Sequence, residues 1–408
     1  MHKTIVCLAA AVACAAPLMA APQTTPSPPL TFQAAFELAA SRNLGLEAAR
    51  RQKAIREAQI RIAKQYQNPD VAFEASRDTP HEVLMFNFPV EIGGKRDRRI
   101  DLAQAEAAQA DLDVRVEMRV LRRNLRQSFY GLLAADERVR LAGEIVTLVE
   151  RLRQVTQARF EVGAAPRLDV LAADLGLARA TADLDLARSS RAAAQADLNA
   201  VLDQPAGQAL AVTGNLGDAA AVPDVAGATS LAVASNTDLL AAEQEAAVEE
   251  RRVSLLKAER VPTPTFTVGG VFDAPGEFQA GLAGGVSLAI PLFNRNGGEI
   301  AAAHATLFQI QARRDAIRRT VENAVFAAVA RIQALGRQSD TYRKTVVPAA
   351  TELAALAEES YALGRNSVLA LIEAQRASRD VRREHLQTLV DFQSAIADLE
   401  EVIGAAIQ

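Results

Sequence analysis

Two stretches of this 408-residue chain share one pattern, although they lie roughly 200 residues apart. The first is FEVGAAPRLDVLAAD, residues 160–174, and the second is YALGRNSVLALIEAQ, residues 361–375. In each, a glycine (Gly163 or Gly364) follows the first aromatic residue by three places and separates two long segments of helical periodicity. Glycine adopts the left-handed backbone conformation that ends many helices. The pattern therefore predicts two helical hairpins with their tips at these glycines.

The segments around the two tips also follow one order, which indicates an internal duplication of a large unit. Each copy is predicted to contain a short helix, a longer helix, two strands, a very long helix and a return helix. We expect the first repeat over residues 22–203 and the second over residues 229–408. A segment rich in Gly, Ala, Pro and Asp, residues 204–228, is expected to link them.

The first two helices of each copy are predicted to meet at an asparagine. In the first copy they are expected over residues 33–41 and from Asn43 to about Gln67. In the second copy they are expected over residues 231–235 and 237–260, so that Asn236 corresponds to Asn43.

The strands are predicted from alternation of apolar and polar side chains, which is the period of a β-strand. In the first copy the alternation covers residues 71–76 and 84–90, and in the second copy it covers residues 265–272 and 281–293. These lengths are near the ~9–11 residues of a membrane-spanning strand. The alternative interpretation is a soluble hairpin in each copy that packs on the helices.

Four strands are too few to close a membrane barrel, because the smallest such barrels have about eight strands. Open sheet edges are not tolerated in lipid. If these strands enter a membrane, several copies of the chain must therefore build one barrel together. Beyond the N-terminal segment, no uncharged apolar run reaches the roughly 20 residues that a bilayer-spanning helix needs, so we do not expect a helical membrane protein.

Two very long helices are predicted, over residues 96–162 and 299–363. A helix of the first length is ~100 Å long, far longer than a globular core requires. Pro348 is expected to interrupt and bend the second helix. Return helices are expected over residues 166–202 and from the second tip to residue 407. The first long helix carries a coiled-coil seam at steps of four and three: Leu121, Leu125, Ser128, Leu132, Ala135, Val139, Ala142, Val146 and Val149.

The composition argues against several classes of function. With 45 Lys and Arg against 49 Asp and Glu, the formal net charge is −4, so the chain has no overall basic field to attract nucleic acid. The four histidines are scattered, and none has a second histidine at ligand spacing. No nucleophile with an adjacent base is evident. We therefore expect no enzyme activity, no cofactor and no tight metal site.

The N-terminal residues 1–21 have the pattern of a secretory signal peptide, with a short basic start, an apolar run and small residues at the end. Both cysteines, Cys7 and Cys14, lie in this segment, so the mature protein is expected to have no thiol and no disulfide. The alternative is a lipoprotein signal, because residues 11–14, Ala-Val-Ala-Cys, loosely resemble a lipoprotein cleavage box. That processing would leave Cys14 lipidated.

The repeated element order resembles the TolC family of outer-membrane efflux channels over essentially the whole mature chain. The segments FPVEIGGKR (residues 88–96) and IPLFNRNGG (residues 290–298) resemble its heavy-metal branch, typified by CzcC. The resemblance implies a mainly α fold with a small β part, assembled as a homotrimer. Such a trimer has a twelve-stranded β-barrel in the outer membrane of a Gram-negative bacterium and a twelve-helix tunnel across the periplasm.

The resemblance also implies partners and a function. The channel would contact a periplasmic adaptor and, through it, an inner-membrane pump of the resistance-nodulation-division class, and it would export heavy-metal cations. A multidrug or organic-solute channel of the same fold is the alternative. Less favoured alternatives are a periplasmic adaptor, which has one hairpin per chain, and a structural coiled-coil protein, which would not need the strands.

The candidate functional residues lie at the two tips. Acidic residues just after the tip glycines form rings in TolC-like channels, and the matching positions here are Asp169 and Glu373, although Ala370 stands where the second copy would match Asp169. Arg365 is a candidate latch partner. The alternative is that these are solvated charges of a coiled coil. By the same resemblance, the adaptor would contact Val162, Gly163, Ala164, Leu363, Gly364 and Arg365.

A basic group at the end of the second strand, Lys95, Arg96, Arg98 and Arg99, is expected at the membrane boundary. Such residues can contact anionic lipid headgroups. A solvated basic rim is the simpler expectation.

Overall fold

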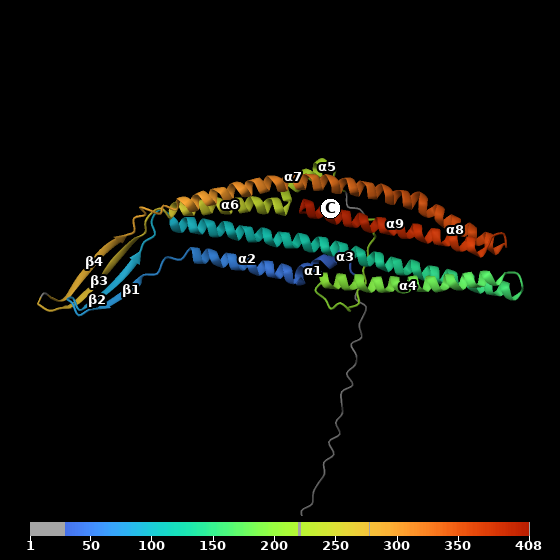
Figure 1. The fold of residues 1–408 in the computed structure, drawn as a ribbon, viewed down its shortest axis with the longest axis horizontal. Helices are drawn as coiled ribbons and strands as arrows, with labels where there is room; N and C mark the ends of the chain where they lie inside the picture. The colour runs from blue at the N-terminus through green and yellow to red at the C-terminus, as the bar shows by residue number, and fades with distance from the viewer. Residues whose placement is uncertain (1–28, 219–221, 277, 408) are drawn as a thin grey trace, which may run out of the picture.

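The computed structural model describes residues 29–218, 222–276 and 278–407, which form an elongated, gently curved layer of helices with a β-sheet at one end (Figure 1). The predicted signal peptide and both cysteines lie outside these residues. The first half contains α1 (Phe32–Arg42), α2 (Leu44–Ala63), β1 (Asp70–Ala75), β2 (Glu82–Pro89), α3 (Lys95–Glu161) and α4 (Arg167–Val201). The second half contains α5 (Val225–Ser235), α6 (Thr237–Ala258), β3 (Pro264–Ala274), β4 (Phe278–Leu288), α7 (Gly297–Thr341), η1 (Tyr342–Val346), α8 (Val347–Ala362) and α9 (Val368–Ile403).

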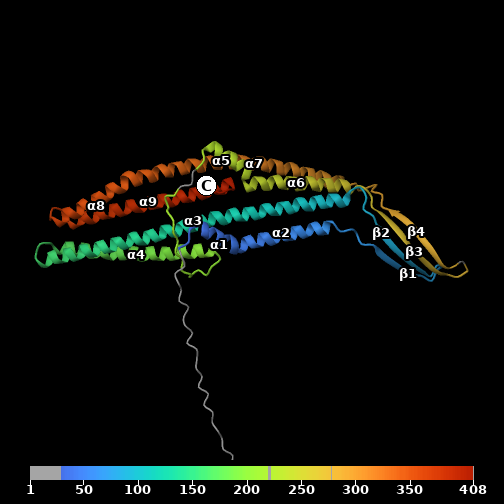
Figure 2. The same ribbon diagram turned by 180° about the vertical axis from the view of Figure 1, so that it is seen from behind.

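The long helices lie side by side in one layer, as the two opposite views show (Figures 1 and 2). Next to the sheet the lateral order is α2, α3, α6, α7, and toward the hairpin tips it is α4, α3, α9, α8. The strands follow the order β1, β2, β3, β4. The elements β1, α2 and α4 therefore form one lateral edge of the molecule, called the first edge below. The elements β4, α7 and α8 form the opposite one, the second edge.

Asparagine side chains join the first two helices of each half, as predicted. The Oδ1 atom of Asn43 accepts a hydrogen bond from the backbone N–H of Leu46 at 2.9 Å. The Oδ1 atom of Asn236 accepts from Asp238 and Leu239 at 3.0 and 2.9 Å. Each asparagine also ends the preceding helix, so one residue caps two helices.

The four strands form one antiparallel sheet with continuous register. Residues in the same row across the sheet include Asp70, Asn87, Thr267 and Gly285. One face is apolar at nearly every position: Val71, Phe73, Ala75, Leu84, Phe86, Phe88, Phe266, Val268, Phe272, Leu282, Val286 and Leu288. The other face is small or polar at most positions: Asp70, Ala72, Glu74, Asn87, Thr265, Thr267, Gly269, Gly281, Ala283, Gly285 and Ser287. The exceptions on this face are Val83, Met85, Pro89 and Val271.

The hydrophobic core is concentrated in the middle of the molecule, where α1 and the residues after α4 pack on α3. Leu125, Phe129, Leu132 and Leu198 are almost completely buried there. Of the predicted coiled-coil seam, Leu121, Leu125, Leu132 and Ala135 are buried. The remaining seam residues toward the tip, such as Val139, Val146 and Val149, are only half-buried, because fewer elements cover α3 in that part of the chain.

Several predicted boundaries are wrong by a few residues. The strand predicted over residues 281–293 is β4, which ends at Leu288 because its partner β3 begins at the facing residue, Pro264. Helix α5 begins at Val225 rather than residue 231, since Asp224 accepts a hydrogen bond from Gly227 N–H and caps it. Helix α2 ends at Ala63 rather than near residue 67.

Pro348 interrupts the second long helix, as predicted. A π-helical turn, η1, separates α7 from α8 immediately before the proline. Proline lacks the N–H that a regular helix needs, and a wider turn accommodates this loss. The π-helical turn contacts α9, where the Tyr342 hydroxyl donates to a Glu384 oxygen at 3.0 Å and the Tyr342 ring stacks on His385. Within the described ranges, no helix is both long enough and apolar enough to cross a bilayer.

Candidate functional sites: the hairpin tips and the sheet–helix junctions

The first hairpin reverses through a hydrogen-bonded turn after α3. Gly163 has φ = 75°, its N–H donates to the Phe160 carbonyl at 2.9 Å, and the Ala164 N–H donates to the Arg159 carbonyl at 2.7 Å. This pair of bonds is the Schellman motif that closes many helix C-termini. Val162, Gly163 and Ala164 are all exposed at the end of the molecule.

The second hairpin reverses through the same motif after α8. Gly364 has φ = 71°, its N–H donates to the Tyr361 carbonyl at 2.9 Å, and the Arg365 N–H donates to the Ser360 carbonyl at 2.9 Å. Leu363, Gly364 and Arg365 are exposed. The predicted positions of both helix reversals are therefore confirmed, while contact of either tip with an adaptor stays a prediction.

The two acidic candidates differ in their surroundings. Asp169 lies in the first turn of α4, half-buried, and has no ion-pair partner within the described ranges. Glu373 is exposed on α9 and forms an ion pair of 2.8 Å with Arg376. The N-terminal end of α4 therefore offsets part of the charge of Asp169, whereas Arg376 offsets part of the charge of Glu373. Their role in a pore ring stays a prediction, as does a latch formed by Arg365.

A contact between the hairpins lies just behind the tips, and it was not predicted. The hydroxyls of Thr156 on α3 and Tyr361 on α8 are buried and 2.9 Å apart. The Arg159 guanidinium lies over the Tyr361 ring at 5.2 Å and donates to the Tyr361 carbonyl at 3.3 Å. These three residues, called the tip contact below, join the first hairpin to the second.

A signal for the tip contact exists in the sequence. Tyr361 and Phe160 hold the same position in the two repeated stretches, three residues before the tip glycine. Tyrosine adds a hydroxyl group that must find a partner when the ring is buried. The exchange of Phe for Tyr between two otherwise equivalent positions therefore indicates a polar contact specific to the second hairpin.

An apolar cavity of about 510 Å³ separates the two hairpins next to the tip contact. Ion pairs bridge its surroundings, including Arg379 with Asp183 at 2.8 Å. The hairpins are thus held together by polar contacts and by an apolar cluster in which Leu152 of α3 packs with Tyr361 and Leu371. The apolar lining comes mainly from α3 and α9: Ile145, Leu148, Val149, Leu152, Leu371 and Ile372.

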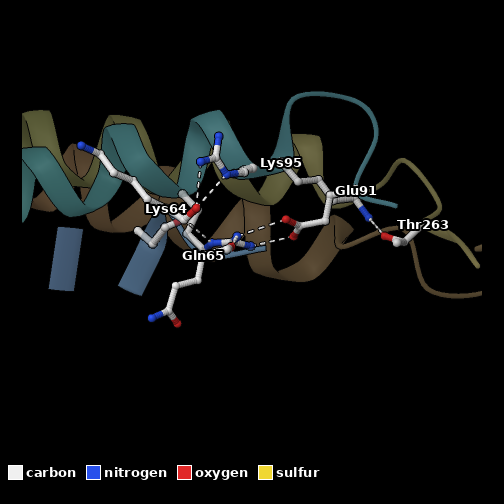
Figure 3. A network of polar contacts seen from close by, with 8 residues as sticks. Lys64, Gln65, Glu91, Lys95 and Thr263 are labelled. Atoms are coloured by element: carbon white, nitrogen blue, oxygen red, sulfur yellow. Dashed lines mark hydrogen bonds and ion pairs between the residues drawn. The ribbon is translucent and has the colours of Figure 1, made fainter. Parts of the chain in front are cut away.

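At the opposite end, the first sheet–helix junction contains a network of polar contacts (Figure 3). The Arg99 guanidinium donates to both carboxylate oxygens of Glu91, at 2.6 and 3.1 Å, and to the backbone carbonyls of Ala63 and Gln65, each at 3.1 Å. Because Arg99 donates to it, the pKa of the Glu91 carboxyl lies below its usual value. The carbonyls at the end of α2 are thereby satisfied, which explains why the helix ends at Ala63.

Arg96 and Lys95 extend this network. Arg96 donates two hydrogen bonds to the Lys64 carbonyl, at 2.9 and 2.8 Å, and Lys95 Nζ donates to the Thr263 hydroxyl at 2.6 Å. The expectation of a solvated basic rim is therefore wrong for Arg96 and Arg99, whose guanidinium groups bind the chain itself, while contact of this basic group with lipid headgroups stays a prediction. Only Arg98 is exposed, next to Asp101.

Across residues 29–218, 222–276 and 278–407, no group of three or more His, Cys, Asp or Glu side chains is arranged to hold a metal ion.

The family of the chain is decided by comparison with family models. The model described as "Outer membrane efflux protein" matches residues 35–204 and 228–405. The chain belongs to the outer membrane efflux protein family. The predicted resemblance to TolC-like channels is thereby confirmed, and the protein is a transport component of the outer membrane rather than an enzyme. Its helical layer extends from the membrane into the periplasm.

Two curated members of this efflux family carry names that refer to metals. The chain is 27% identical over 384 residues to the cobalt-zinc-cadmium resistance protein CzcC of Cupriavidus metallidurans, covering 92% of this chain and 90% of that protein. It is 26% identical over 283 residues to the nickel-cobalt-cadmium resistance protein NccC of Alcaligenes xylosoxydans, covering 67% of this chain and 61% of that protein. The predicted CzcC-like branch is confirmed by these relatives.

Solved structures share the fold of this efflux protein at low sequence identity. The crystal structure of CusC has a TM-score of 0.77 at 16% identity and covers 92% of both chains. The CmeC outer membrane channel of Campylobacter jejuni has a TM-score of 0.76 at 13% identity, covering 92% of this chain and 86% of that one. The arrangement of long hairpins with a small four-stranded sheet is therefore common to these channels.

Proposed function

We propose that this protein is one subunit of a homotrimeric outer-membrane channel that exports heavy-metal cations. Four strands from each of three copies close a twelve-stranded β-barrel, and the helices form a twelve-helix tunnel across the periplasm. The hairpin tips contact a periplasmic adaptor, which connects the tunnel to an inner-membrane pump of the resistance-nodulation-division class. Each subunit contributes two repeats, residues 22–203 and 229–408, joined by residues 204–228.

The observation that carries the proposal is the pair of open sheet edges. Among the residues that the structure describes, β1 pairs only with β2 and β4 pairs only with β3, so each has one side without a backbone partner there. Unpaired backbone groups are not tolerated in lipid, and pairing β4 of one copy with β1 of the next satisfies them. Three copies then give twelve strands, an even number within the range of bacterial outer-membrane barrels.

Exposed apolar side chains along both lateral edges support the same assembly. On the first edge they are Leu44, Ile55, Ile62, Leu168, Leu171, Leu175 and Leu186, and on the second edge they are Phe308, Phe326, Leu353 and Leu356. Large apolar patches of this extent are rare on monomeric soluble proteins. In the ring, β1, α2 and α4 of one copy face β4, α7 and α8 of the next, so both sets become covered.

The two faces of the sheet support a barrel wall. The apolar face suits lipid, and the opposite face, with Asp70, Asn87 and Thr267 in one row, suits a water-filled interior. On the apolar face Phe266 and Phe272 lie six residues apart, which corresponds to ~20 Å along the strand. Aromatic residues at that separation fit the two girdles that border the apolar band of a membrane barrel.

The cargo follows from the relatives and from the charges near the tips. CzcC and NccC are named for resistance to cobalt, cadmium and other divalent metals. Three copies of Asp169, and three copies of Glu373, would place carboxylate rings at the narrow end of the tunnel. Rings of Asp and Glu favour cations in channels.

The cargo is tested by deleting the gene and measuring growth in zinc, cobalt, cadmium, nickel and copper salts, and in a panel of organic drugs. The proposal predicts hypersensitivity to divalent metals that the intact gene restores. Hypersensitivity to drugs alone would instead identify a multidrug or organic-solute channel of the same fold.

The pore rings are tested by planar-bilayer conductance of the purified channel. The Asp169→Asn, Glu373→Gln double variant should lose most of its preference for cations, and Asp169→Asn alone should have the larger single effect because Arg376 already offsets Glu373. Asp113→Asn is the matched control, since Asp113 is an exposed α3 carboxylate in the half of the helix nearer the sheet. Unchanged selectivity in the double variant would contradict the rings.

A further inference from the structure

Two aromatic side chains stand exposed at the junctions between the sheet and the helices. Tyr66, in the segment 64–69 between α2 and β1, is 75% exposed, and Phe293, in the segment 289–296 between β4 and α7, is 102% exposed. The first segment belongs to the first edge of the molecule and the second to the opposite edge. Neither exposure is explained by contacts within one chain.

In each segment an arginine side chain donates to a backbone carbonyl, while most of the aromatic ring is exposed. Arg96 anchors the Lys64 carbonyl through two hydrogen bonds and covers one face of the Tyr66 ring at 4.4 Å. On the other edge, Arg260 Nε donates to the Arg295 carbonyl at 2.8 Å. A ring presented on an anchored backbone loses little conformational freedom when it is covered, which is the condition for a specific contact.

The strand directions decide which groups meet when copies join. Strand β1 begins, and strand β4 ends, at the edge of the sheet nearest the helices (Figure 1). Antiparallel pairing of β4 with β1 of the next copy therefore brings segment 289–296 of one copy beside segment 64–69 of its neighbour. Two further apolar side chains are exposed nearby in sequence: Leu292 directly precedes Phe293, and Ile62, in the last turn of α2, precedes Tyr66 by four residues.

We propose that Phe293 of one copy packs on the open face of Tyr66 of the next copy. The Tyr66 ring then lies between Phe293 and the Arg96 guanidinium of its own chain. Aromatic pairs and cation–π contacts each stabilise such an arrangement. This contact rests on the ring assembly proposed above, and it adds a specific intersubunit contact at the membrane boundary. The alternative occupant of this position is the lipid interface, where aromatic residues are also common.

The contact can be tested by tryptophan fluorescence, because the sequence contains no tryptophan and an introduced one is the only source of indole emission. The Phe293→Trp variant, purified and inserted into phosphatidylcholine vesicles, contains a single tryptophan. The contact predicts blue-shifted emission, little quenching by iodide, and little quenching by brominated phosphatidylcholine. Adding Tyr66→Ala should raise iodide quenching several-fold. The matched control is Ile92→Trp, at the junction of β2 and α3 away from both edges, whose quenching should not respond to Tyr66→Ala.

Each other result excludes the contact for a definite reason. Strong quenching by the brominated lipid would make residue 293 a lipid anchor. Iodide quenching that is high with or without Tyr66 would show that the side chain at position 293 is exposed to water. Chemical cross-linking of the same samples separates the two proposals: a trimer with an accessible tryptophan overturns only the aromatic contact, whereas a monomer overturns the ring assembly as well.

Discussion

The two hairpins use the same turn at their tips but differ in what their side chains do. Both reverse through a Schellman motif with glycine in the left-handed conformation. The aromatic residue before the first glycine, Phe160, is 40% exposed, whereas its counterpart Tyr361 is 5% exposed and bonded to Thr156 of the other hairpin. The outward arm of the first hairpin is the single helix α3, but that of the second is broken at η1.

This comparison shows that the duplicated hairpins share their backbone turn but not the side-chain contacts around it. The backbone reversal needs only a residue that tolerates positive φ, so it is the same in both copies. The side chains around it differ: Tyr361 of the second hairpin is buried against Thr156 and Arg159 of the first. The first hairpin therefore has the continuous outward helix, and both hairpins contribute side chains to the contact that joins them.

The largest expected effect is the difference in lost stability between removing the Tyr361 ring and removing the Phe160 ring. Tyr361→Ala should destabilise the tip region by about 3–5 kcal/mol, because a buried aromatic ring leaves a cavity. Phe160→Ala should cost less than about 1 kcal/mol, because its ring is already partly in water. Thermal unfolding together with hydrogen exchange of residues 152–176 and 353–376 measures both. Equal losses would contradict the assigned difference between the hairpins.

The junctions provide a second, smaller contrast. The first junction depends on the Arg99–Glu91 ion pair, while in the second Arg260 binds a backbone carbonyl. The folded state lowers the pKa of Glu91, so its stabilising effect is present above the unfolded value of about 4.3 and is lost as pH falls through the lower folded value. Glu91→Gln should therefore cost about 1–2 kcal/mol at pH 7, after allowance for the partly exposed arginine.

The measurement is the difference in thermal midpoint between wild type and Glu91→Gln from pH 8 to pH 3. This difference should be constant down to about pH 5 and should then shrink toward pH 3. Asp101→Asn, which removes the exposed pair with Arg98, is the matched control and should cost no more than about 0.5 kcal/mol. A difference that grows as the pH falls would have the wrong sign for this ion pair.

The smallest expected effect is that of the hydrogen bond between the hairpins. In a double-mutant cycle of Thr156→Val and Tyr361→Phe, the coupling free energy should be about 1 kcal/mol, since both hydroxyls are buried and neither change removes the ring. Thr147→Val is the control, because the Thr147 hydroxyl bonds only within α3. A coupling free energy of zero would mean that the hydrogen bond between the Thr156 and Tyr361 hydroxyls does not stabilise the protein.

The elements and the faces of the strands could be predicted from the sequence because they depend on local periodicity. The long helix α3 was predicted within one residue at each end, and the apolar face with Phe86 and Phe266 follows directly from alternation. The tip glycines were equally clear, because positive φ is a local requirement.

What could not be predicted depends on partners distant in sequence. Strand β4 ends opposite the first residue of β3, and α2 ends where Arg99 satisfies its carbonyls, neither of which is visible in a local pattern. The Thr156–Tyr361 bond joins residues about 200 positions apart, and only the exchange of Phe for Tyr between repeats indicated it. Arg96 and Arg99 were expected in solvent because a cluster of basic residues usually is solvated.

The uninterrupted length of α3 has a mechanical consequence. The same helix begins at the Arg99 network and ends at the first tip, so it acts as a rigid lever of ~100 Å. A tilt of about 3° at the sheet end of a helix of this length would displace the far end by about 5 Å. A small change of angle at the Arg99 network would therefore be amplified into a displacement of several ångströms at the first tip.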